Sequence, residues 1–534
     1  MYYSEYTSMV MQQRNKNMGG FIMKLKQVLA YGMAAVISLS LLTGCGSGSQ
    51  NAPEDKKAGV ENAAGDPEEI VFAFHMGKTI DLTPIEDALN EILIPKINVK
   101  VNLEGYSWSN YDTQIGLMQS GGEQLDVFGM CPNFSTFLTN NQLMSMDGLI
   151  DEYAAETREI IGEDFLKSTS KGGSIYALPE YGGKADVNCF VLRKDLVDEL
   201  NLPVDRLKEA KTFDEYVENM EVLTEIFEAV HEAHPELVIV PSSQNPASLR
   251  VTEIPFADRL GDGIGVLMPG DETKVVNMYA TEEFKTLANY VYKWNQAGYI
   301  LEDATTTQEA AQNYLKNGRA FAYFEPGRIE EKLAQNIKKT TGHEVFTTKL
   351  SEAMADTNKI TNSAFGISVT SKHPEASMKF LNEMYTDPAV MNILSFGIEG
   401  VHWEKKDGGV IGYPEGVNAD NSTYELGLDW YFGNDFLNET WQGNDPADKE
   451  ADMENNKTLK VSPAMGFNFD STSVSTELAA IANVTNQYLP GILCGSLDPE
   501  SAIPKFLAAL KGAGIDAVVA EKQAQLDSWR AENK

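Results

Sequence analysis

The hydrophobic positions of the chain follow two periods, and their alternation predicts an α/β fold. Residues 70–74 form a short continuous apolar run, typical of a strand that is buried on both faces. A helix is predicted from Thr83, because Thr83-Pro84-Ile85-Glu86 matches a capping box with proline at the first helical position. Strands are predicted at 99–103 and 126–128, with a helix over 111–119 between them. This order is typical of a parallel sheet with right-handed crossovers.

The same alternation restarts further along the chain. Strands are predicted at 189–192, 237–240, 320–324 and 364–369. Thr212-Phe213-Asp214-Glu215 forms a second capping box at the start of a long amphipathic helix, and two later helices begin near Pro374 and Pro388. Residues 472–532 are predicted to be almost wholly helical, with breaks at Pro490, Pro499 and 512–514. The pattern therefore predicts two parallel-sheet lobes and a helical tail.

The segment before the first strand indicates export. Lys24 and Lys26 precede an apolar stretch over 28–42, and Leu42-Thr43-Gly44-Cys45 ends it. About 15 apolar residues are too few for the ~20 that span a bilayer. The segment resembles a bacterial lipoprotein signal with its lipobox. The resemblance implies cleavage before Cys45, acylation of its thiol with chains such as palmitate, and a protein held at the extracytoplasmic face of the cell membrane.

Composition narrows the possible partners. Residues 1–44 are predicted to be a signal peptide whose natural start is Met23, and 45–66 to be the lipidated cysteine and a flexible tether. Without residues 1–44 the chain has 39 basic and 77 acidic side chains, a net charge of −38. Such a surface repels nucleic acid, which we exclude as a partner. Cys131, Cys189 and Cys494 form no CxxC motif, so three buried free thiols are expected, with no metal site and no cofactor.

Several short motifs together carry a resemblance that covers nearly the whole chain after Cys45. The motifs are QSGGEQLDV at 119–127, IYALP at 175–179, LRKDL at 192–196, TFDE at 212–215, NGRA at 317–320, SKHPEA at 371–376, YTDP at 385–388 and FGIEGVHW at 396–403. No single motif is specific, whereas their order and spacing are. Together they resemble the extracellular solute-binding proteins of bacterial ABC importers, carbohydrate-type family 1, in the long lipoprotein subgroup of Gram-positive bacteria.

The resemblance implies a two-lobe, periplasmic-binding-protein-like (type II) fold with a hinge and a ligand cleft between the lobes. The expected boundaries are 67–182 plus 365–400 for the first lobe, and 183–364 plus 401–534 for the second. The implied function is to bind a solute, expected to be an oligosaccharide, and to deliver it to ABC permease subunits by closing around it. A monomer that performs no catalysis is expected.

Candidate ligand contacts lie in loops that follow predicted strands. Parallel sheets bind ligands there, and sugars need aromatic faces and planar polar groups. Tyr106 and Trp108 follow the second strand, and Asn133 follows the third, although each ring could instead pack on its neighbouring helix. The resemblance adds Asp126, whose alternative role is a turn or cap acid. It also adds positions at the expected crossings and at the second lobe, namely Glu180, Tyr181, Lys184, Glu325, Arg328, His402 and Trp403.

A few further motifs could indicate metal binding or catalysis instead of solute binding. His231 and His234 are three residues apart and Pro235 follows them, which does not match a zinc helix. The acidic cluster Asp445, Asp448, Glu450 and Asp452 lacks the spacing of a calcium loop and is expected to form a solvated surface loop. Trp430-Tyr431-Phe432 could line a pocket, but packing of the tail against a lobe is favoured. A lipid-anchored polysaccharide-degrading enzyme and a peptide-binding or adhesion lipoprotein remain the alternatives.

Overall fold

The computed structural model describes residues 65–77, 80–184, 186–242, 249–307, 309–419 and 421–533. The chain divides into two units, 1–67 and Glu68–Lys534, and the fold below is that of the second unit. Cys45, the predicted signal peptide and the predicted tether up to residue 64 lie outside the described residues.

The first lobe is built on a five-stranded sheet of order β2-β1-β3-β13-β6. β1 (Glu68–Met76) runs parallel to β2 (Val99–Ser107) and to β3 (Val127–Met130), as the sequence predicts. β13 (Ala364–Ile367) is antiparallel to β3 and to β6 (Leu178–Pro179). The first two crossovers contain α2 (Thr83–Ile97) and α3 (Tyr111–Gly121). Because both faces of β1 are covered, its apolar run is buried at every position except the half-buried Val71.

The predicted capping box at Thr83 is wrong in its details. Leu82 occupies the N-cap position of α2, and no side chain caps the helix there. The Glu86 carboxylate instead accepts a hydrogen bond from the Leu103 backbone N–H of β2, 2.8 Å away. Glu86 therefore links the helix to the sheet. The predicted start of the helix is correct because of Pro84, which occupies its first turn.

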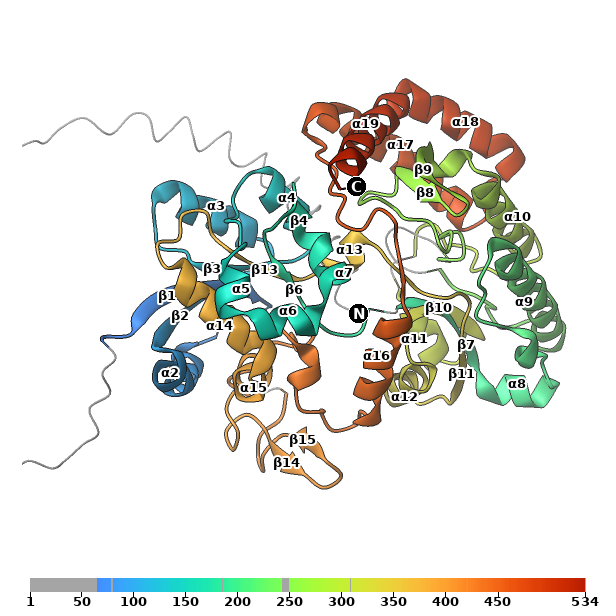
Figure 1. The fold of residues 1–534 in the computed structure, drawn as a ribbon. Coiled ribbons are helices and arrows are strands. Elements are labelled where there is room, and N and C mark those ends of the chain that lie inside the picture. The colour runs from blue at the N-terminus through green and yellow to red at the C-terminus, as the bar shows by residue number, and fades with distance from the viewer. Residues whose placement is uncertain are drawn as a thin grey trace, which may run out of the picture. The chain divides into compact units, whose positions relative to one another are not determined.

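Short helices surround the first sheet. After β3 come α4 (Phe134–Thr139), α5 (Leu149–Tyr153), α6 (Ala155–Ile161), α7 (Glu163–Leu166) and η1 (Lys167–Thr169), then the β4 (Ser170–Lys171) and β5 (Ser174–Ile175) hairpin. α14 (Pro374–Thr386) and α15 (Pro388–Phe396) follow β13, and both begin at the prolines that predict them. α14 packs against α5 and α6, and α15 packs against α2 (Figure 1).

The second lobe contains an antiparallel sheet, where the sequence pattern predicts a parallel one. β7 (Val187–Arg193) lies between β10 (Ala322–Gly327) and β11 (Val345–Lys349) and is antiparallel to both. Only isolated parallel bridges, Val238 with Ala320 and Val240 with Ile300, match the predicted arrangement. The covering helices are α8 (Lys194–Leu200), α9 (Phe213–Ala233), α10 (Glu282–Gln296), α11 (Ala311–Lys316) and α12 (Glu330–Thr341), with short turns η2 (Val204–Arg206) and η3 (Met278–Ala280).

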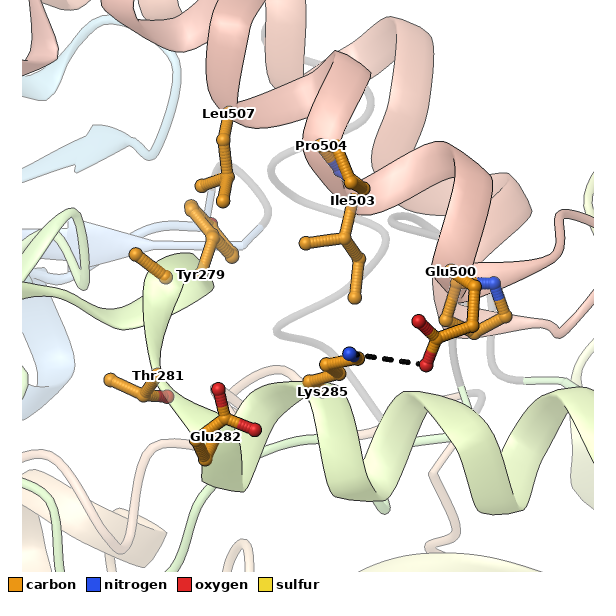
Figure 2. A pocket seen from close by; sticks show the side chains of 10 residues that line it. Tyr279, Thr281, Glu282, Lys285, Glu500, Ile503, Pro504 and Leu507 are labelled. Carbon is orange, nitrogen blue, oxygen red and sulfur yellow. Dashed lines mark ion pairs between the residues drawn. The ribbon is translucent and has the colours of Figure 1, made fainter.

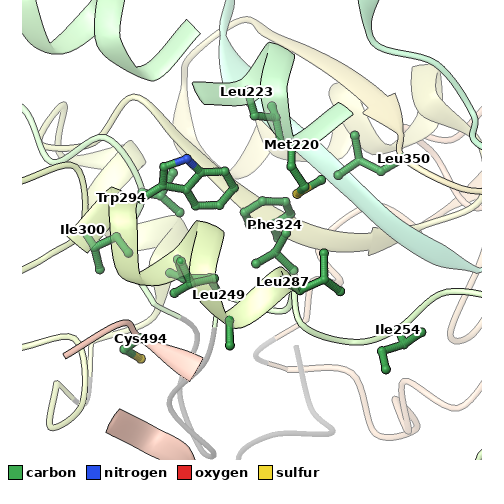
Figure 3. Close-up of a cluster of buried hydrophobic side chains, with 14 of the residues drawn as sticks. Met220, Leu223, Leu249, Ile254, Leu287, Trp294, Ile300, Phe324, Leu350 and Cys494 are labelled. Atoms are coloured by element: carbon green, nitrogen blue, oxygen red, sulfur yellow. The ribbon is translucent and has the colours of Figure 1, made fainter. Parts of the chain in front are cut away.

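A large hydrophobic core fills the second lobe. Figure 3 shows Trp294 from α10, Phe324 from β10 and Leu249 converging, with Cys494 from the C-terminal region beside them. The Trp294 indole N–H donates to the Thr224 hydroxyl at 2.8 Å, so this buried ring has its polar atom satisfied. Cys131, Cys189 and Cys494 are buried free thiols, which confirms the expectation.

The C-terminal helices belong to that same core. α17 (Ser475–Leu493), α18 (Pro499–Gly512) and α19 (Ile515–Glu532) follow η5 (Thr472–Val474), beside α10 and the hairpin of β8 (Gly265–Met268) and β9 (Asp271–Asn277) (Figure 1). The predicted breaks at Pro499 and at 512–514 are confirmed. The break at Pro490 is wrong, because this proline is accommodated inside the last turn of α17.

Residues beyond 400 return to the first lobe before they reach the tail. After the β14 (Glu404–Lys406) and β15 (Val410–Gly412) hairpin, the chain inserts Tyr424, Leu428, Tyr431 and Phe432 into the core that also contains Phe72 and Phe365. η4 (Asp435–Leu437) follows. These side chains thus pack in the first-lobe core, although the expected second lobe includes 401–534. The exact lobe boundaries stay a prediction.

Three segments join the two cores. The first runs from β6 into β7, and the second contains β12 (Met354–Ala355) and α13 (Thr357–Ile360). The third contains α16 (Ala447–Thr458) and β16 (Lys460–Val461), and β16 pairs in parallel with β12. These are called the connecting segments below. Across the described ranges, none of the helices has the length and apolar character needed to cross a membrane.

Candidate functional site

Five rings gather where β1 and β2 end at the carboxyl edge of the first sheet. His75, one residue before the end of β1, lies between Trp108 and Tyr111, with ring centroids 4.3 and 3.6 Å away. Trp430 is nearly parallel to Trp108 at 6.4 Å, and Tyr431 meets Trp108 edge-on at 6.3 Å. We call His75, Trp108, Tyr111, Trp430 and Tyr431 the aromatic layer. Trp430 is its exposed member, with 36% of its surface accessible.

The aromatic layer is uncharged at neutral pH. Burial lowers the pKa of His75 to about 3, so its imidazole is neutral. His75 Nδ1 lies 2.9 Å from the Tyr431 hydroxyl, which satisfies both polar groups. Burial also raises the pKa of Tyr111 and of Tyr431 well above the usual range. The layer therefore offers a neutral aromatic surface that suits the C–H faces of a sugar.

Polar groups border this layer. Asn133, after β3, donates through Nδ2 to the Asp112 carboxylate at 2.7 Å. Burial raises the pKa of Asp112, and the Asn133 hydrogen bond opposes that rise. The half-buried Tyr106 donates its hydroxyl to Glu104 at 3.2 Å, and burial raises its pKa to about 12. Amide, carboxylate and phenol groups beside exposed indole are the set that pairs with hydroxyl-rich ligands.

Asp126 has a structural role. It is fully buried, and its two oxygens accept hydrogen bonds from the Val71 backbone N–H, the Gln124 amide and the Ser371 hydroxyl at 2.9, 2.8 and 2.6 Å. With three donors in place, the carboxylate joins β1 to the loop after β13 and has little capacity left for a ligand.

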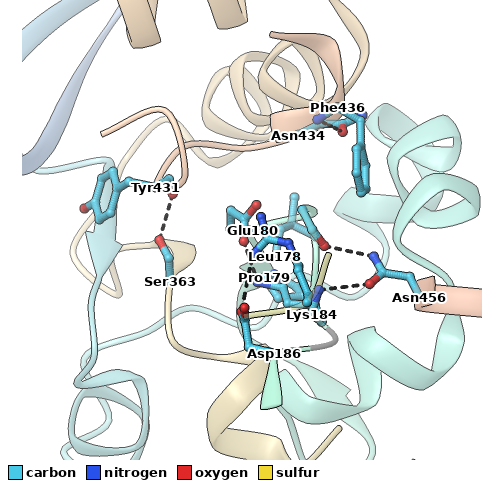
Figure 4. A network of polar contacts seen from close by, with 12 residues as sticks. Leu178, Pro179, Glu180, Lys184, Asp186, Ser363, Tyr431, Asn434, Phe436 and Asn456 are labelled. Carbon is cyan, nitrogen blue, oxygen red and sulfur yellow. Dashed lines mark hydrogen bonds and ion pairs between the residues drawn. The ribbon is translucent and has the colours of Figure 1, made fainter. Parts of the chain in front are cut away.

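Glu180 and Lys184 form a buried ion pair in the first connecting segment. Burial raises the pKa of Glu180 to about 7, although the Lys184 ammonium opposes this rise. The Asn456 side chain from α16 accepts from the Lys184 backbone N–H at 2.9 Å and donates to the Gly182 carbonyl at 2.8 Å (Figure 4). α16 is thus hydrogen-bonded to the backbone of the segment that contains this pair.

Arg328 connects the second lobe to two connecting segments. It donates through Nε to Asp452 of α16 at 2.9 Å and through Nη1 to Asp186 at 3.2 Å. Burial alone would lower the pKa of Arg328, but the charges of Asp186 and Asp452 raise it. The expected solvated loop at 445–452 is therefore wrong, because Asp452 is buried in a helix and pairs with a cation.

Glu325 lies within β10, one strand position before Pro326, whereas the sequence predicts it in the following loop. Its carboxylate is half-buried and accepts no hydrogen bond from the residues that the structure describes. Burial raises its pKa, and the Arg250 charge opposes the rise. Close by, Asn188 donates to Glu253 at 3.1 Å. We call Asn188, Arg250, Glu253 and Glu325 the second half-site.

His402, Trp403 and Tyr181 point into the protein. His402 Nδ1 accepts from the Ile398 backbone N–H at 2.9 Å, and Nε2 lies 2.9 Å from the Thr423 hydroxyl. The Trp403 indole donates to the Gly397 carbonyl at 2.9 Å. Tyr181 is half-buried, and its ring packs edge-on against Phe436. The chain does not cross between the lobes at Gly400, so the reason for choosing His402 and Trp403 is lost.

Sequence reasoning missed several members of the site. His75 sits in an apolar strand and gives no sign of its neighbours. Trp430 is more than 300 positions away from Trp108, and neither segment gives a sign that the two rings meet. Asn456 and Asp452 lie in a polar helix with no motif. The one signal of the site in this region is the triplet Trp430-Tyr431-Phe432, in a segment rich in glycine and asparagine, although the sequence favours a packing role for it.

A pocket of about 180 Å³ lies elsewhere, between the start of α10 and α18. Lys285 of α10 pairs with Glu500 of α18 at 3.1 Å, and Ile503 and Leu507 form an apolar wall (Figure 2). None of the predicted site residues lines it. Within the described ranges no group of three or more His, Cys, Asp or Glu side chains is placed to hold a metal ion.

The first lobe carries an aromatic layer at the carboxyl edge of its sheet, and three connecting segments join this lobe to the second. These features define a two-lobe α/β binding protein. The family model for bacterial extracellular solute-binding proteins matches residues 63–391, and the chain belongs to that family. A second model, which describes a domain of unknown function, matches residues 463–531. Since the family is one of binding proteins, the prediction of solute binding rather than catalysis is confirmed at that level.

Known relatives agree with this assignment. A carbohydrate ABC transporter substrate-binding protein of Streptococcus pneumoniae is 25% identical over 528 residues, covering 96% of this chain and 100% of that protein. The crystal structure of the N-glycan transport solute-binding protein NgtS from the same species matches with a TM-score of 0.73 and 23% identity, covering 88% and 100% of the two chains. The calcium-free structure of the alginate-binding protein AlgQ2 matches at 0.54 and 18%, covering 87% and 99%. The predicted fold with C-terminal helices is confirmed.

Proposed function

We propose that this protein captures a neutral oligosaccharide outside the cytoplasm and delivers it to an ABC permease, while a lipidated Cys45 holds it at the membrane. The observation that carries the proposal is the aromatic layer, in which the exposed Trp430 lies nearly parallel to Trp108 at the carboxyl edge of a parallel sheet. Asn133 and Asp112 beside it supply hydrogen-bonding groups.

The ligand class follows from the chemistry of the layer and from the relatives. A neutral histidine between two rings offers no charge to an anionic ligand, and the chain has a net charge of −35. NgtS has been crystallised with Man1GlcNAc and with Man5GlcNAc, and a further structural neighbour binds kestose. Mannose- and N-acetylglucosamine-containing oligosaccharides are therefore the first ligands to test.

Binding is proposed to close the two lobes around the ligand. The three connecting segments are the elements about which such a motion would occur, and the second half-site would meet the sugar from the other side. Closure shifts a population toward a compact state, so ligand should reduce the radius of gyration.

The test is a titration of the purified protein with Man1GlcNAc, Man5GlcNAc and unrelated glycans. At a ligand concentration 100 times the dissociation constant, binding stabilises the folded state by about 2.7 kcal/mol, which should raise the melting temperature by several degrees. Small-angle scattering of the same mixture should show compaction. The proposal fails if no glycan raises the melting temperature, and release of new reducing ends would instead favour the degradative enzyme.

The anchor is tested separately in cells. Cys45→Ala should abolish incorporation of labelled palmitate and leave an unprocessed precursor. A variant that is processed and retained like the wild type would remove the anchor from the proposal without affecting the binding site.

A further inference from the structure

The C-terminal region that matches a domain of unknown function is an integral part of the second lobe. Its helices contribute fully buried side chains to the same core as β7, β10 and α9, including Ile481, Ile492, Phe506, Leu510 and Val518. A second, smaller cluster joins Leu526 of α19 to Leu260 and Leu267. The tail therefore packs against the segment that leads into β8.

That neighbouring segment, residues 249–267, has an unusual backbone. Arg250, Phe256 and Leu260 have φ angles of 62°, 67° and 44°, in the left-handed region that side chains other than glycine seldom adopt. Such conformations are strained and persist only when surrounding contacts enforce them.

The tail holds this segment at two points. At its start, the Leu249 backbone N–H donates to the carbonyl of Leu493, the last residue of α17, at 3.4 Å. Near its end, the residues Asp258 and Leu267 exchange two backbone hydrogen bonds of 3.0 and 2.9 Å, which close residues 258–267 into a loop. The Lys522 side chain of α19 enters that loop.

Lys522 has no exposed surface, and its ammonium is fully engaged by the loop. It donates to Asp262 Oδ1 at 2.5 Å and to the carbonyls of Leu260 and Gly265, both at 3.2 Å. The Phe469 ring lies 4.8 Å away on another side. A buried ammonium is costly unless all of its protons are accepted, so Lys522 and the loop conformation depend on each other.

The first residues of the same segment belong to the second half-site. Arg250 and Glu253 lie in the second half-site with Asn188 and Glu325, at the carboxyl end of β10. The loop also contacts a connecting segment, because Asn358 of α13 donates to the Gly261 carbonyl at 2.9 Å. Contacts made by the tail can thus be transmitted to both the half-site and a connecting segment.

We infer that the C-terminal helical region is the positioning element of the second half-site, with Lys522 as the positioning residue that fixes residues 249–267 in their ligand-facing conformation. The inference rests on the proposed function for the identity of the ligand, but the coupling between Lys522 and the segment does not.

The experiment compares Lys522→Met with the wild type and with a matched control. Methionine keeps most of the side-chain volume and removes the ammonium. Lys511→Met is the control, since Lys511 is in the same region with 76% of its side chain exposed and only a 3.8 Å contact to Asp516. Amide hydrogen exchange is followed at 249–267 and, for reference, at 427–434 in the first lobe. Calorimetric affinity for Man1GlcNAc and Man5GlcNAc is measured well below the melting temperature.

We expect exchange at 249–267 in Lys522→Met to accelerate at least tenfold with no change at 427–434, and affinity per folded molecule to fall about tenfold. The ratio of the two glycan affinities should change as well. Lys511→Met should match the wild type. Unchanged exchange at 249–267 would overturn the inference, and so would faster exchange with unchanged affinity, because the tail would then serve only packing.

A second variant covers the case in which Lys522→Met does not fold. Asp262→Asn keeps an oxygen acceptor on a side chain that is 28% exposed, and should cause a smaller acceleration at the same amides. If the wild type binds no glycan at all, the proposed function fails by itself, while the exchange measurements still decide whether Lys522 holds the segment.

Discussion

The aromatic layer and the ion pairs Glu180–Lys184, Arg328–Asp186 and Arg328–Asp452, which we call the connecting network, are held together by different interactions. The layer holds His75, Trp108 and Tyr111 together by stacking, and its histidine is kept neutral. The network that includes Glu180, Lys184 and Arg328 consists of paired charges. Stacking is insensitive to salt and gives affinity to any ligand with an apolar face, whereas buried ion pairs fix geometry and are costly once one partner is lost.

This contrast suggests that the aromatic layer serves ligand binding and the connecting network serves the fold. Changes in the layer should act mainly on ligand affinity, and changes in the network mainly on folding or on its pH dependence.

Arg328→Met should produce the largest loss of stability. The change leaves Asp452, with 5% of its side chain exposed, as an unpaired buried carboxylate beside Asp186. Removing one partner of a buried pair costs about 3–5 kcal/mol, so the free energy of unfolding should fall by about 3 kcal/mol in a denaturant titration. Arg206→Met is the control, because its pair with Glu225 is half exposed and should contribute less than about 1 kcal/mol. Equal losses in both variants would contradict a structural role for the network.

Glu180→Gln should remove a pH dependence. The Glu180 pKa is raised from 4.5 to about 7, so the carboxyl binds its proton more tightly in the folded state. Its contribution to stability is therefore fully present below about pH 4.5 and is lost as the pH rises through about 7. Relative to the variant, the wild type should lose about 3 kcal/mol of unfolding free energy across that window. Unfolding titrations at several pH values provide the measurement.

The control for this experiment is Glu225→Gln, an exposed carboxyl whose pKa is lowered by the Arg206 hydrogen bond. It should leave the dependence between pH 4.5 and 7 as in the wild type. Parallel curves for wild type and Glu180→Gln would show that Glu180 titrates normally in the folded protein.

Trp108→Ala should weaken ligand binding by about 1–2 kcal/mol, some five- to thirtyfold in the dissociation constant. The ring stacks on His75 and lies nearly parallel to Trp430, so part of its contribution is internal packing. Calorimetric affinity and the thermal midpoint should be measured on one sample. Trp441→Ala, which removes a partly buried indole packed on Phe396 and Tyr413, is the matched control. Lost stability with unchanged affinity would assign Trp108 to packing alone.

The sequence predicted the first lobe better than the second, for a physical reason. In the first lobe the buried runs at 70–74 and 99–103 are separated by helices, and a parallel sheet is the arrangement that such crossovers favour. In the second lobe β7 reads as the same kind of buried run, but its partners β10 and β11 come from more than 120 positions away and run antiparallel. A run that is buried on both faces carries no sign of its direction.

The positions of the candidate residues agree with the sequence where they follow a strand and differ where they depend on a crossing, while their ligand contacts stay a prediction. Trp108 and Asn133 lie just past β2 and β3, as expected, whereas Tyr106 lies inside β2, one residue before its end. His402 and Trp403 were tied to an inferred crossing near Gly400 that the chain does not make, since the third connecting segment is formed by α16 and β16. Long-range pairings such as His75 with Tyr431 leave no local signal, because neither residue type is unusual in its own segment.

Trp430→Ala should give the smallest effect and the clearest view of the layer as a binding surface. Trp430 is 36% exposed and its indole N–H makes only a 3.2 Å hydrogen bond to the Gly427 carbonyl of the same turn. Little packing is lost with this ring, so stability should change by less than about 0.5 kcal/mol. If the ligand stacks on it, affinity should fall by about 0.5–1 kcal/mol, or roughly two- to fivefold.

Combining this change with Trp108→Ala completes a double-mutant cycle. Because the two nearly parallel indoles lie 6.4 Å apart, a ligand that contacts both should make their losses non-additive by at least about 0.5 kcal/mol. Additive losses would mean that the rings meet the ligand independently. An unchanged affinity in Trp430→Ala would restrict the binding surface to Trp108 and the polar groups beside it, and the exposed indole would then belong to the rim of the lobe rather than to the site.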